Sequence, residues 1–305
     1  MRLGVIGLGN IGSAIAANLA ADGHELCVCD RDASRCEPLL AAGASAAQGP
    51  AEVARRSEFT FLSLPTSEAV DSVAGEWLDG AQQGAVLIDL STNAPAAVRA
   101  LGERVAAAGC QLFEAPLTGG APGARARTLV FLVGGERVVY ERCRPLLEKL
   151  GRAVFYFGEL GRGNAAKLVN SLLAFTSTWV SLEGLAIASR AGLDLRTLVE
   201  AVRTGGASNF YVDRMVEGIN QRGRPASFAL ELAAKDAGLI RDLAHEQGVP
   251  APVAEQIAQV MGAAVEAGLG ARDWSDLVEF MERRADVKLE LPAATPPPSG
   301  SPQRR

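Results

Sequence analysis

The stretch RLGVIGLGNIGSAIAANLAADG, residues 2–23, decides the fold of the first half of the chain. An apolar run of strand character leads into the glycine-rich turn GLGNIG, and a segment with helical spacing follows at once. In this context the first glycine permits a tight bend, the second lets a pyrophosphate approach the backbone, and the third lets the helix pack on the strand. Free N–H groups at the start of the helix supply the anion site. We therefore predict that a dinucleotide binds at the six residues of the turn, Gly7, Leu8, Gly9, Asn10, Ile11 and Gly12.

The residue that follows the second apolar run bears on the choice of dinucleotide. That run, ELCVC at residues 25–29, leads into Asp30, where a carboxylate bonds the adenosine ribose hydroxyls and repels a 2′-phosphate. Asp32 adds a second negative charge against the phosphate, whereas Arg31 between them could bind it. The sequence therefore favours NAD and leaves NADP open, with Asp30 and Arg31 as cofactor-binding residues.

The pattern of the chain changes near residue 162. Before it, short apolar runs alternate with helical segments, which is typical of a mostly parallel sheet covered on both faces by helices. After it, residues 163–290 show only helical periodicity with glycine breaks. Residues 291–305, LPAATPPPSGSPQRR, are rich in proline and serine, so we expect a disordered tail there. The strands are predicted at residues 2–9, 25–30, 59–65, 85–91, 111–116, 128–135 and 153–158.

Composition and charge argue against several classes of protein. The 305 residues are 48% hydrophobic and 21% charged, which is ordinary for a soluble globular protein. The net charge of -5 argues against a general nucleic-acid binder, and no uninterrupted apolar run of about 18 residues indicates a membrane span. The cysteines are odd in number and lack both a CxxC pair and a nearby histidine, which favours reduced thiols over disulfides or a metal site. We expect a soluble, cytoplasmic protein that binds no metal, nucleic acid or membrane.

A lysine in GNAAKLVNSLL, residues 163–173, is the candidate proton carrier. Oxidation of an alcohol by NAD requires a group that takes the hydroxyl proton, and neither His24 nor His245 lies in a catalytic motif. Helical spacing places Lys167, Asn170 and Ser171 on one face. The ordinary lysine pKa of about 10.4 is too high for a base near neutrality. Burial and the positive nicotinamide of NAD would both lower the pKa of Lys167, so it is the best-placed group.

The glycine-rich segment PLTGGAPG, residues 116–123, is a candidate ligand-binding loop. Thr118 offers a hydroxyl, and the backbone N–H groups near Gly119 and Gly120 can converge because no side chains obstruct the approach. A flexible strand–helix loop without a ligand is the alternative.

Four blocks of sequence carry a resemblance to a known family. In order they are GLGNIG, EAPLTGGAPGARARTLVFLVGG, GRGNAAKLVNSLL and KDAGL. With these the chain resembles the β-hydroxyacid dehydrogenases, the group of 3-hydroxyisobutyrate dehydrogenase and tartronate semialdehyde reductase. The resemblance implies an α/β Rossmann domain at residues 1–162. A long interdomain helix then opens an all-α C-terminal domain at 163–290, which helps to form a homodimer or homotetramer. It also implies NAD(P)-dependent interconversion of a small β-hydroxy acid, the carboxylate-bearing substrate, and its semialdehyde.

The resemblance also implies roles for individual residues. Lys167 matches the catalytic lysine, and Asn170 and Ser171 lie in the substrate-contacting turn that follows it. The residues implied in carboxylate binding are Thr118, Gly119 and Gly120. Those implied in cofactor contacts are Leu64, Pro65, Thr92 and Lys235.

The chain departs from the family pattern at several of these blocks. Glu114, Leu117 and Thr118 stand where the family usually has Asp, Val and Ser, and Ser171 stands where a second asparagine is common. Arg127 replaces a usual glycine and could recognise a second acidic group or simply be solvated. An imine or ketone reductase on the same scaffold is an alternative, although those relatives usually replace the lysine. A dinucleotide-binding sensor or scaffold without turnover is another.

Overall fold

The computed structural model describes residues 1–290, which contacts between residues divide into two compact units. The first unit contains Met1–Leu172 and Leu232–Ala258, and the second contains Leu173–Glu231 and the described residues from Gln259 onward. This division differs from the predicted boundary at residues 162/163, because residues 163–172 and 232–258 both group with the first unit. The predicted tail, residues 291–305, lies outside the described residues.

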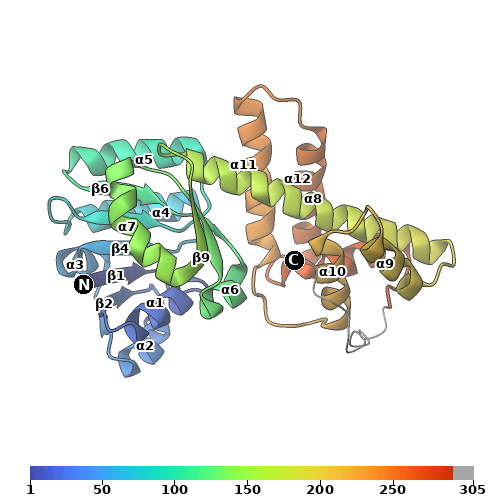
Figure 1. The fold of residues 1–305 in the computed structure, drawn as a ribbon, viewed down its shortest axis with the longest axis horizontal. Helices are drawn as coiled ribbons and strands as arrows, with labels where there is room; N and C mark the ends of the chain where they lie inside the picture. Colours follow the sequence, from blue (N-terminus) through green and yellow to red (C-terminus); the bar gives the residue numbers. More distant parts are fainter. Residues whose placement is uncertain (291–305) are drawn as a thin grey trace. The chain divides into compact units, whose positions relative to one another are not determined.

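The first unit is built on a six-stranded parallel sheet (Figure 1). The strand order is β3-β2-β1-β4-β5-β6, which is the Rossmann order. Every residue of β4 and β5 is buried, as expected of strands covered on both faces. The bounds of the strands are β1 Arg2–Ile6, β2 Glu25–Cys29, β3 Ser45–Ala46, β4 Phe59–Leu62, β5 Val86–Asp89 and β6 Gln111–Glu114.

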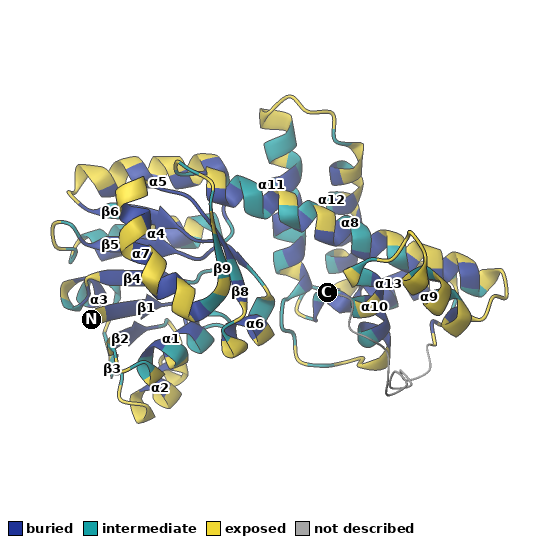
Figure 2. Cartoon of the chain, in the orientation of Figure 1, coloured by how far each residue is buried: buried dark blue, intermediate teal, exposed yellow. Residues whose placement is uncertain are grey.

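Helices cover both faces of this sheet (Figure 2), and each face has its own apolar core. Side chains of α1 (Gly12–Ala21), α2 (Glu37–Ala41) and α7 (Arg137–Leu150) belong to one core. Those of α3 (Pro50–Arg56), α4 (Ser67–Leu78) and α5 (Pro95–Ala107) belong to the other. Successive residues of β1 point to opposite faces of the sheet, so Val5 packs into one core and Ile6 into the other. The predicted α/β Rossmann domain is confirmed.

A second, three-stranded sheet follows the parallel one. In it β8 (Leu129–Val133) pairs with β7 (Leu117–Thr118) in antiparallel fashion and with β9 (Gly151–Tyr156) in parallel. The predicted strands at 128–135 and 153–158 therefore do not extend the main sheet. Apolar runs predict a strand but not its partner, and β3 and β7 were not predicted because two residues carry no periodicity. Helix α6 (Gly120–Ala126) connects β7 to β8.

The chain after β9 is helical throughout the described residues. Helix α8 (Arg162–Arg190) is, by length and composition, the one described helix long and apolar enough to cross a membrane, and half of its apolar window is buried inside the protein. The helices that follow are α9 (Leu195–Thr204), α10 (Phe210–Asn220), α11 (Leu230–Glu246), α12 (Pro252–Ala264) and α13 (Leu277–Ala285). Single turns complete the set at η1 (Ala33–Cys36), η2 (Val265–Leu269) and η3 (Trp274–Asp276).

The second unit is held together around the turn that contains η3. The carboxylate of Asp273 is fully buried and accepts hydrogen bonds from the backbone N–H and hydroxyl of Ser227, at 2.8 and 2.7 Å. It also accepts from the hydroxyl of Ser275 at 2.7 Å and from Arg224 at 3.1 Å. We call these four residues the Asp273 cluster. The neighbouring Trp274 ring packs against three aromatic rings, those of Phe175, Tyr211 and Phe228.

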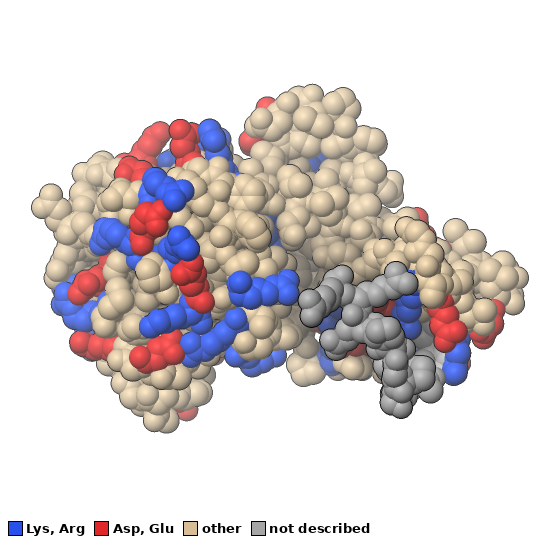
Figure 3. All heavy atoms as spheres, in the orientation of Figure 1, with Lys and Arg blue, Asp and Glu red and all other residues tan. Residues whose placement is uncertain are grey.

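Charged side chains of both signs are interspersed on the viewed face of the first unit (Figure 3). On α7 the pairs Arg137–Glu141 and Arg144–Glu148 are spaced four residues apart along the helix. This face therefore carries mixed charge and no continuous basic field.

Candidate active site

The glycine turn between β1 and α1 has the geometry that a pyrophosphate requires. Gly7 has a φ of +89°, which L side chains rarely adopt. A Cβ on Gly12 would lie 1.9 Å from the carbonyl oxygen of Gly7, so only glycine lets α1 begin this close to the turn. A Cβ on Gly9 would meet no heavy atom within 4 Å, so the space beside that backbone is open. The turn fits a dinucleotide whose pyrophosphate approaches at Gly9, beside the N-terminus of α1.

Asp30, next to the end of β2, holds the glycine turn in place. Its Oδ2 accepts a hydrogen bond from the backbone N–H of Leu8 at 2.6 Å, and its Oδ1 accepts from the N–H of Asp32 at 2.9 Å. A carboxylate has further acceptor positions, so Asp30 can also receive a ribose hydroxyl. The guanidinium nearest to Asp30 is that of Arg35, at 3.6 Å, which the sequence reasoning missed. Arg31 is exposed.

The loops after β4 and β5 bring several predicted cofactor contacts together. The backbone N–H of Leu64 donates to the hydroxyl of Ser91 at 3.0 Å, which joins the two loops. The ammonium of Lys235 donates to the carbonyl oxygen of Thr92 at 2.6 Å, so α11 is tied to the loop after β5. Lys235 also pairs with the buried carboxylate of Asp236 at 2.9 Å.

Lys167 lies in the second turn of α8 and is partly buried. Burial lowers the pKa of its ammonium group; the carboxylate of Asp236 opposes this effect, and the ammonium of Lys235 adds to it. The direction is the one that a general base near neutrality requires. The two predicted lysines therefore share one electrostatic environment with Asp236, a residue that the sequence reasoning did not single out.

The candidate carboxylate loop has a backbone that only glycine adopts easily. Gly119, between β7 and α6, has a φ of +118°, and Gly120, the first residue of α6, has a φ of +59°. Thr118 is the last residue of β7 and pairs with Val130 of β8. The substrate-binding roles of this loop and of Asn170 and Ser171 stay predictions.

Arg127 is not available as a substrate-recognition residue in this structure. Its guanidinium pairs with Asp22 at 2.9 Å and donates to the carbonyl oxygen of Asn18 at 3.0 Å. Both partners belong to α1 or the residue that ends it. The arginine therefore ties the end of α6 to α1. Its contacts in the structure are with the protein, which differs from both predicted roles of Arg127, recognition of a second acidic group and simple solvation.

The sequence reasoning gave no role to two buried carboxylates near the site. Glu114, at the end of β6, accepts hydrogen bonds from the backbone N–H groups of Gly163 and Asn164 and from the Asn164 side-chain amide, at 2.9, 3.0 and 2.6 Å. Asp89, at the end of β5, accepts from the side-chain amide of Asn93 at 2.7 Å. Asn164 and Asn93 are joined in turn, because the backbone N–H of Asn93 donates to Asn164 Oδ1 at 2.7 Å.

Burial raises the pKa of Asp89 to about 6 and also raises that of Glu114, although hydrogen bonds to both carboxylates oppose the change. A signal for these residues was present in the sequence. Each acidic residue ends an otherwise apolar run of a parallel sheet, and it is at the carboxyl ends of parallel strands that ligand sites form.

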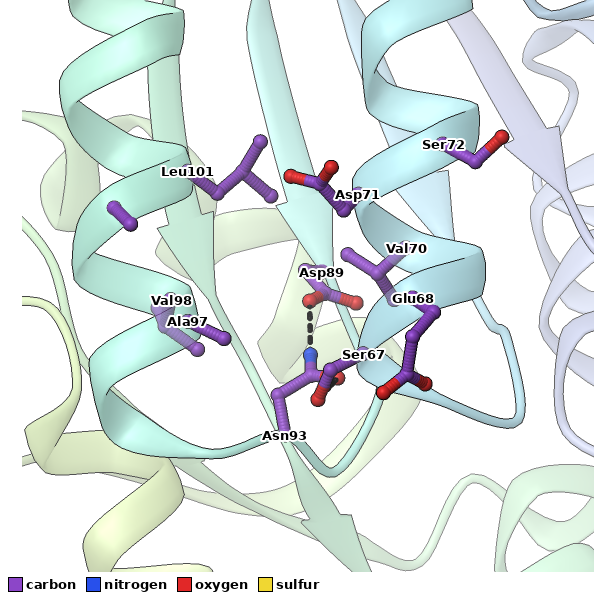
Figure 4. Close-up of a pocket in the computed structure, with 11 residues that line it drawn as sticks. Ser67, Glu68, Val70, Asp71, Ser72, Asp89, Asn93, Ala97, Val98 and Leu101 are labelled. Carbon is purple, nitrogen blue, oxygen red and sulfur yellow. Dashed lines mark hydrogen bonds between the residues drawn. The ribbon is translucent and has the colours of Figure 1, made fainter.

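A cavity of about 450 Å³ lies between α4 and α5, with Asp89 and Asn93 in its wall (Figure 4). None of the residues predicted to bind cofactor or substrate lines it. Asn93 also belongs to the loop after β5, in which the carbonyl oxygen of the preceding Thr92 accepts the hydrogen bond from Lys235.

Comparison with known proteins agrees with this geometry. Residues 2–158 match the model of the NAD binding domain of 6-phosphogluconate dehydrogenase. Residues 161–281 match the model described as NAD-binding of NADP-dependent 3-hydroxyisobutyrate dehydrogenase. The mitochondrial 3-hydroxyisobutyrate dehydrogenase of Drosophila melanogaster is 32% identical over 290 residues, covering 92% of this chain and 90% of the relative.

Solved structures give the same result. The 3-hydroxyisobutyrate dehydrogenase of Mycobacterium tuberculosis, solved with L-serine, superposes with a TM-score of 0.82 at 25% identity, covering 92% of this chain and 99% of that one. An imine reductase of Myxococcus stipitatus, at 21% identity and a TM-score of 0.63 over 92% of this chain and 100% of its own, shares the fold alone.

A Rossmann fold with a glycine turn open to a pyrophosphate, matched by both NAD-binding models, defines an NAD(P)-binding oxidoreductase. Within that class, the chain belongs to the β-hydroxyacid dehydrogenase family.

Proposed function

We propose that the protein interconverts a small β-hydroxy acid and its semialdehyde, with Lys167 as the general acid and base. The observation that carries the proposal is the lowered pKa of Lys167, which lies beside Lys235 and Asp236 next to a dinucleotide-binding fold. The 3-hydroxyisobutyrate dehydrogenases among the relatives support the substrate class.

The residues of the chain divide the work in this proposal. Bound NAD(P) supplies the hydride acceptor or donor. Lys167, in its neutral form, takes the proton of the substrate hydroxyl during oxidation, and its ammonium form returns a proton during reduction. Thr118, Gly119 and Gly120 hold the substrate carboxylate, which limits substrates to those with an acidic group near the reacting carbon.

We propose NAD as the preferred dinucleotide. The carboxylate of Asp30 accepts a hydrogen bond from the backbone N–H of Leu8 in the glycine turn, and Asp32 lies two residues further along the chain. A 2′-phosphate at this point would meet both carboxylates. The nearest guanidinium, Arg35, is already paired with both of them.

A screen of the purified protein tests the proposal. Reduction of NAD or NADP is followed at 340 nm with 3-hydroxyisobutyrate, glycerate, serine and 4-hydroxybutyrate, and its reverse with the matching aldehydes. We expect turnover with at least one β-hydroxy acid, and a higher kcat/KM for NAD than for NADP. Turnover of cyclic imines but of no hydroxy acid would instead identify an imine reductase. Dinucleotide binding without turnover of either class would identify a sensor.

We also propose that the protein is a homo-oligomer. Leu173, Val180 and Ile187 recur every seven residues on α8, and their exposed fractions are 64%, 55% and 70%. Such a stripe is suited to pack against a second copy. Light scattering coupled to size exclusion should give a dimer or larger, and Val180→Glu should shift it toward monomer. A wild-type monomer at micromolar concentration would refute the proposal.

A further inference from the structure

Glu114 joins the main sheet to the beginning of the helix that carries Lys167. Its side chain is fully buried, and its two oxygens accept three hydrogen bonds from the first turn of α8, one to Oε1 and two to Oε2. A negative charge at a helix N-terminus also interacts favourably with the helix dipole. The contact is therefore a specific one between a carboxylate and a helix end. Gly163 and Asn164 of α8 donate to it, and the backbone N–H of Gly161, just before the helix, contributes as well.

The surroundings of Glu114 leave its carboxylate little freedom. A Cβ on Gly134 would lie 2.2 Å from Glu114 Oε1, so the side chain occupies the space that a larger residue at 134 would fill. A Cβ on Gly163 would lie 2.6 Å from the carbonyl oxygen of Leu132, so α8 begins in direct contact with the end of β8. The backbones of Glu114 and Gly134 exchange two hydrogen bonds of 3.0 Å, which fix the end of β6 as well.

Lys167 follows Gly163 and Asn164 by one turn of the same helix. Because an α-helix is rigid over one turn, a shift of its first residues moves the lysine by a similar distance. Asn164 also accepts from Asn93, and the adjacent residue Thr92 binds Lys235. The helix start is thus linked to the loop that carries the second lysine of the site.

We infer that Glu114 is a positioning residue, which sets the place of Lys167 by binding the first turn of α8. The inference rests on the proposed role of Lys167 in proton transfer. Misplacement of a reacting group by about 1 Å costs on the order of 100-fold in rate, so loss of this contact should be visible in turnover.

Two substitutions separate positioning from packing. Glu114→Gln keeps the size of the side chain but replaces one acceptor oxygen with an amide that faces an N–H donor. Glu114→Asp keeps both acceptor oxygens and shortens the side chain. If Glu114 acts by positioning the helix through its two oxygens, turnover should be highest in wild type, lower in Glu114→Asp and lowest in Glu114→Gln. If the side chain only fills space, Glu114→Gln should be more active than Glu114→Asp. At saturating cofactor and substrate, we expect kcat to fall about 10- to 100-fold in Glu114→Gln and less in Glu114→Asp.

Control variants make the result decisive. Glu159→Gln alters an exposed carboxylate that pairs with Arg162 at the same helix start, and its kcat should stay within about twofold of wild type. A Glu114→Gln protein with wild-type kcat would overturn the inference, and so would one more active than Glu114→Asp. If Glu114→Gln does not fold, Asn164→Ala replaces it, because it removes one donor to Oε2, and an unchanged kcat would overturn the inference equally.

Lys167→Ala is measured in parallel. Full turnover by that variant means that the proposed function fails, whereas its inactivity together with unaffected Glu114 variants means that only the positioning inference fails.

Discussion

Replacing Lys167 with alanine is expected to lower kcat/KM about 10²- to 10⁴-fold and to leave dinucleotide binding intact. Lys167 belongs to α8, whereas the pyrophosphate would bind at the glycine turn between β1 and α1. Loss of a proton carrier therefore affects the chemical step, whereas the cofactor keeps its anion site. Turnover is measured at 340 nm and NADH binding by fluorescence. Lys167→Arg should be nearly as inactive, because a guanidinium stays protonated at any pH the enzyme tolerates. Lys149→Ala, which removes an exposed lysine from α7, is the control.

The pH dependence of the wild-type enzyme should show the same group. Because burial lowers the pKa of Lys167, the neutral base is present at a lower pH than for an ordinary lysine. The rate of oxidation should therefore rise with pH and level off below the ordinary value of about 10.4. The rate of reduction should fall over the same interval, since it needs the ammonium form. An oxidation rate with no titrating group below about pH 9 would contradict the role of Lys167.

The parts of this site that lie close together in sequence could be predicted from it. GLGNIG and Asp30 were predictable because a strand, a turn and the next strand end follow one another at fixed intervals. The hydrogen bond from Leu8 to Asp30 confirms that the structure brings them together. Lys167 was identified because its sequence block matches that of the resembled family and because neither histidine lies in a catalytic motif. The lowered pKa of Lys167 has the predicted direction.

The contacts between distant segments could not be predicted. Glu114 and Gly163 are 49 positions apart, and nothing in the apolar run around Glu114 names its partner. Arg127 and Asp22 are 105 positions apart. The sequence therefore could not distinguish an arginine that binds α1 from one that is solvated in a loop. The separate sheet of β7, β8 and β9 was missed for the same reason, because strand pairing is set by tertiary packing.

Removing the carboxylate of Asp273 should strongly destabilise the second unit. Asp273→Ala removes a fully buried carboxylate and leaves the Arg224 guanidinium, which is only 20% exposed, without its charge partner. Breaking a buried pair in this way costs about 3–5 kcal/mol in free energy of unfolding. Asp213→Ala removes a carboxylate that is 53% exposed and paired with Arg203, and should cost at most about 1 kcal/mol. Denaturant unfolding is followed in a Trp77→Phe background, where the remaining tryptophans, Trp179 and Trp274, both lie in the second unit.

Lowering the pH should reduce the difference in stability between the wild-type protein and Asp273→Asn. Burial alone would raise the pKa of Asp273, but hydrogen bonds from Ser275 and Ser227 outweigh it and hold the pKa well below the usual range. A carboxylate whose folded pKa is depressed contributes stability that is fully present above its unfolded pKa of about 3.9 and is lost as the pH falls through the folded pKa. The wild-type advantage in the unfolding midpoint should therefore be constant from about pH 8 to 5 and shrink below about pH 4. An advantage that grew on acidification, or an Asp273→Ala midpoint equal to that of Asp213→Ala, would show that the charge of Asp273 does not hold the turn.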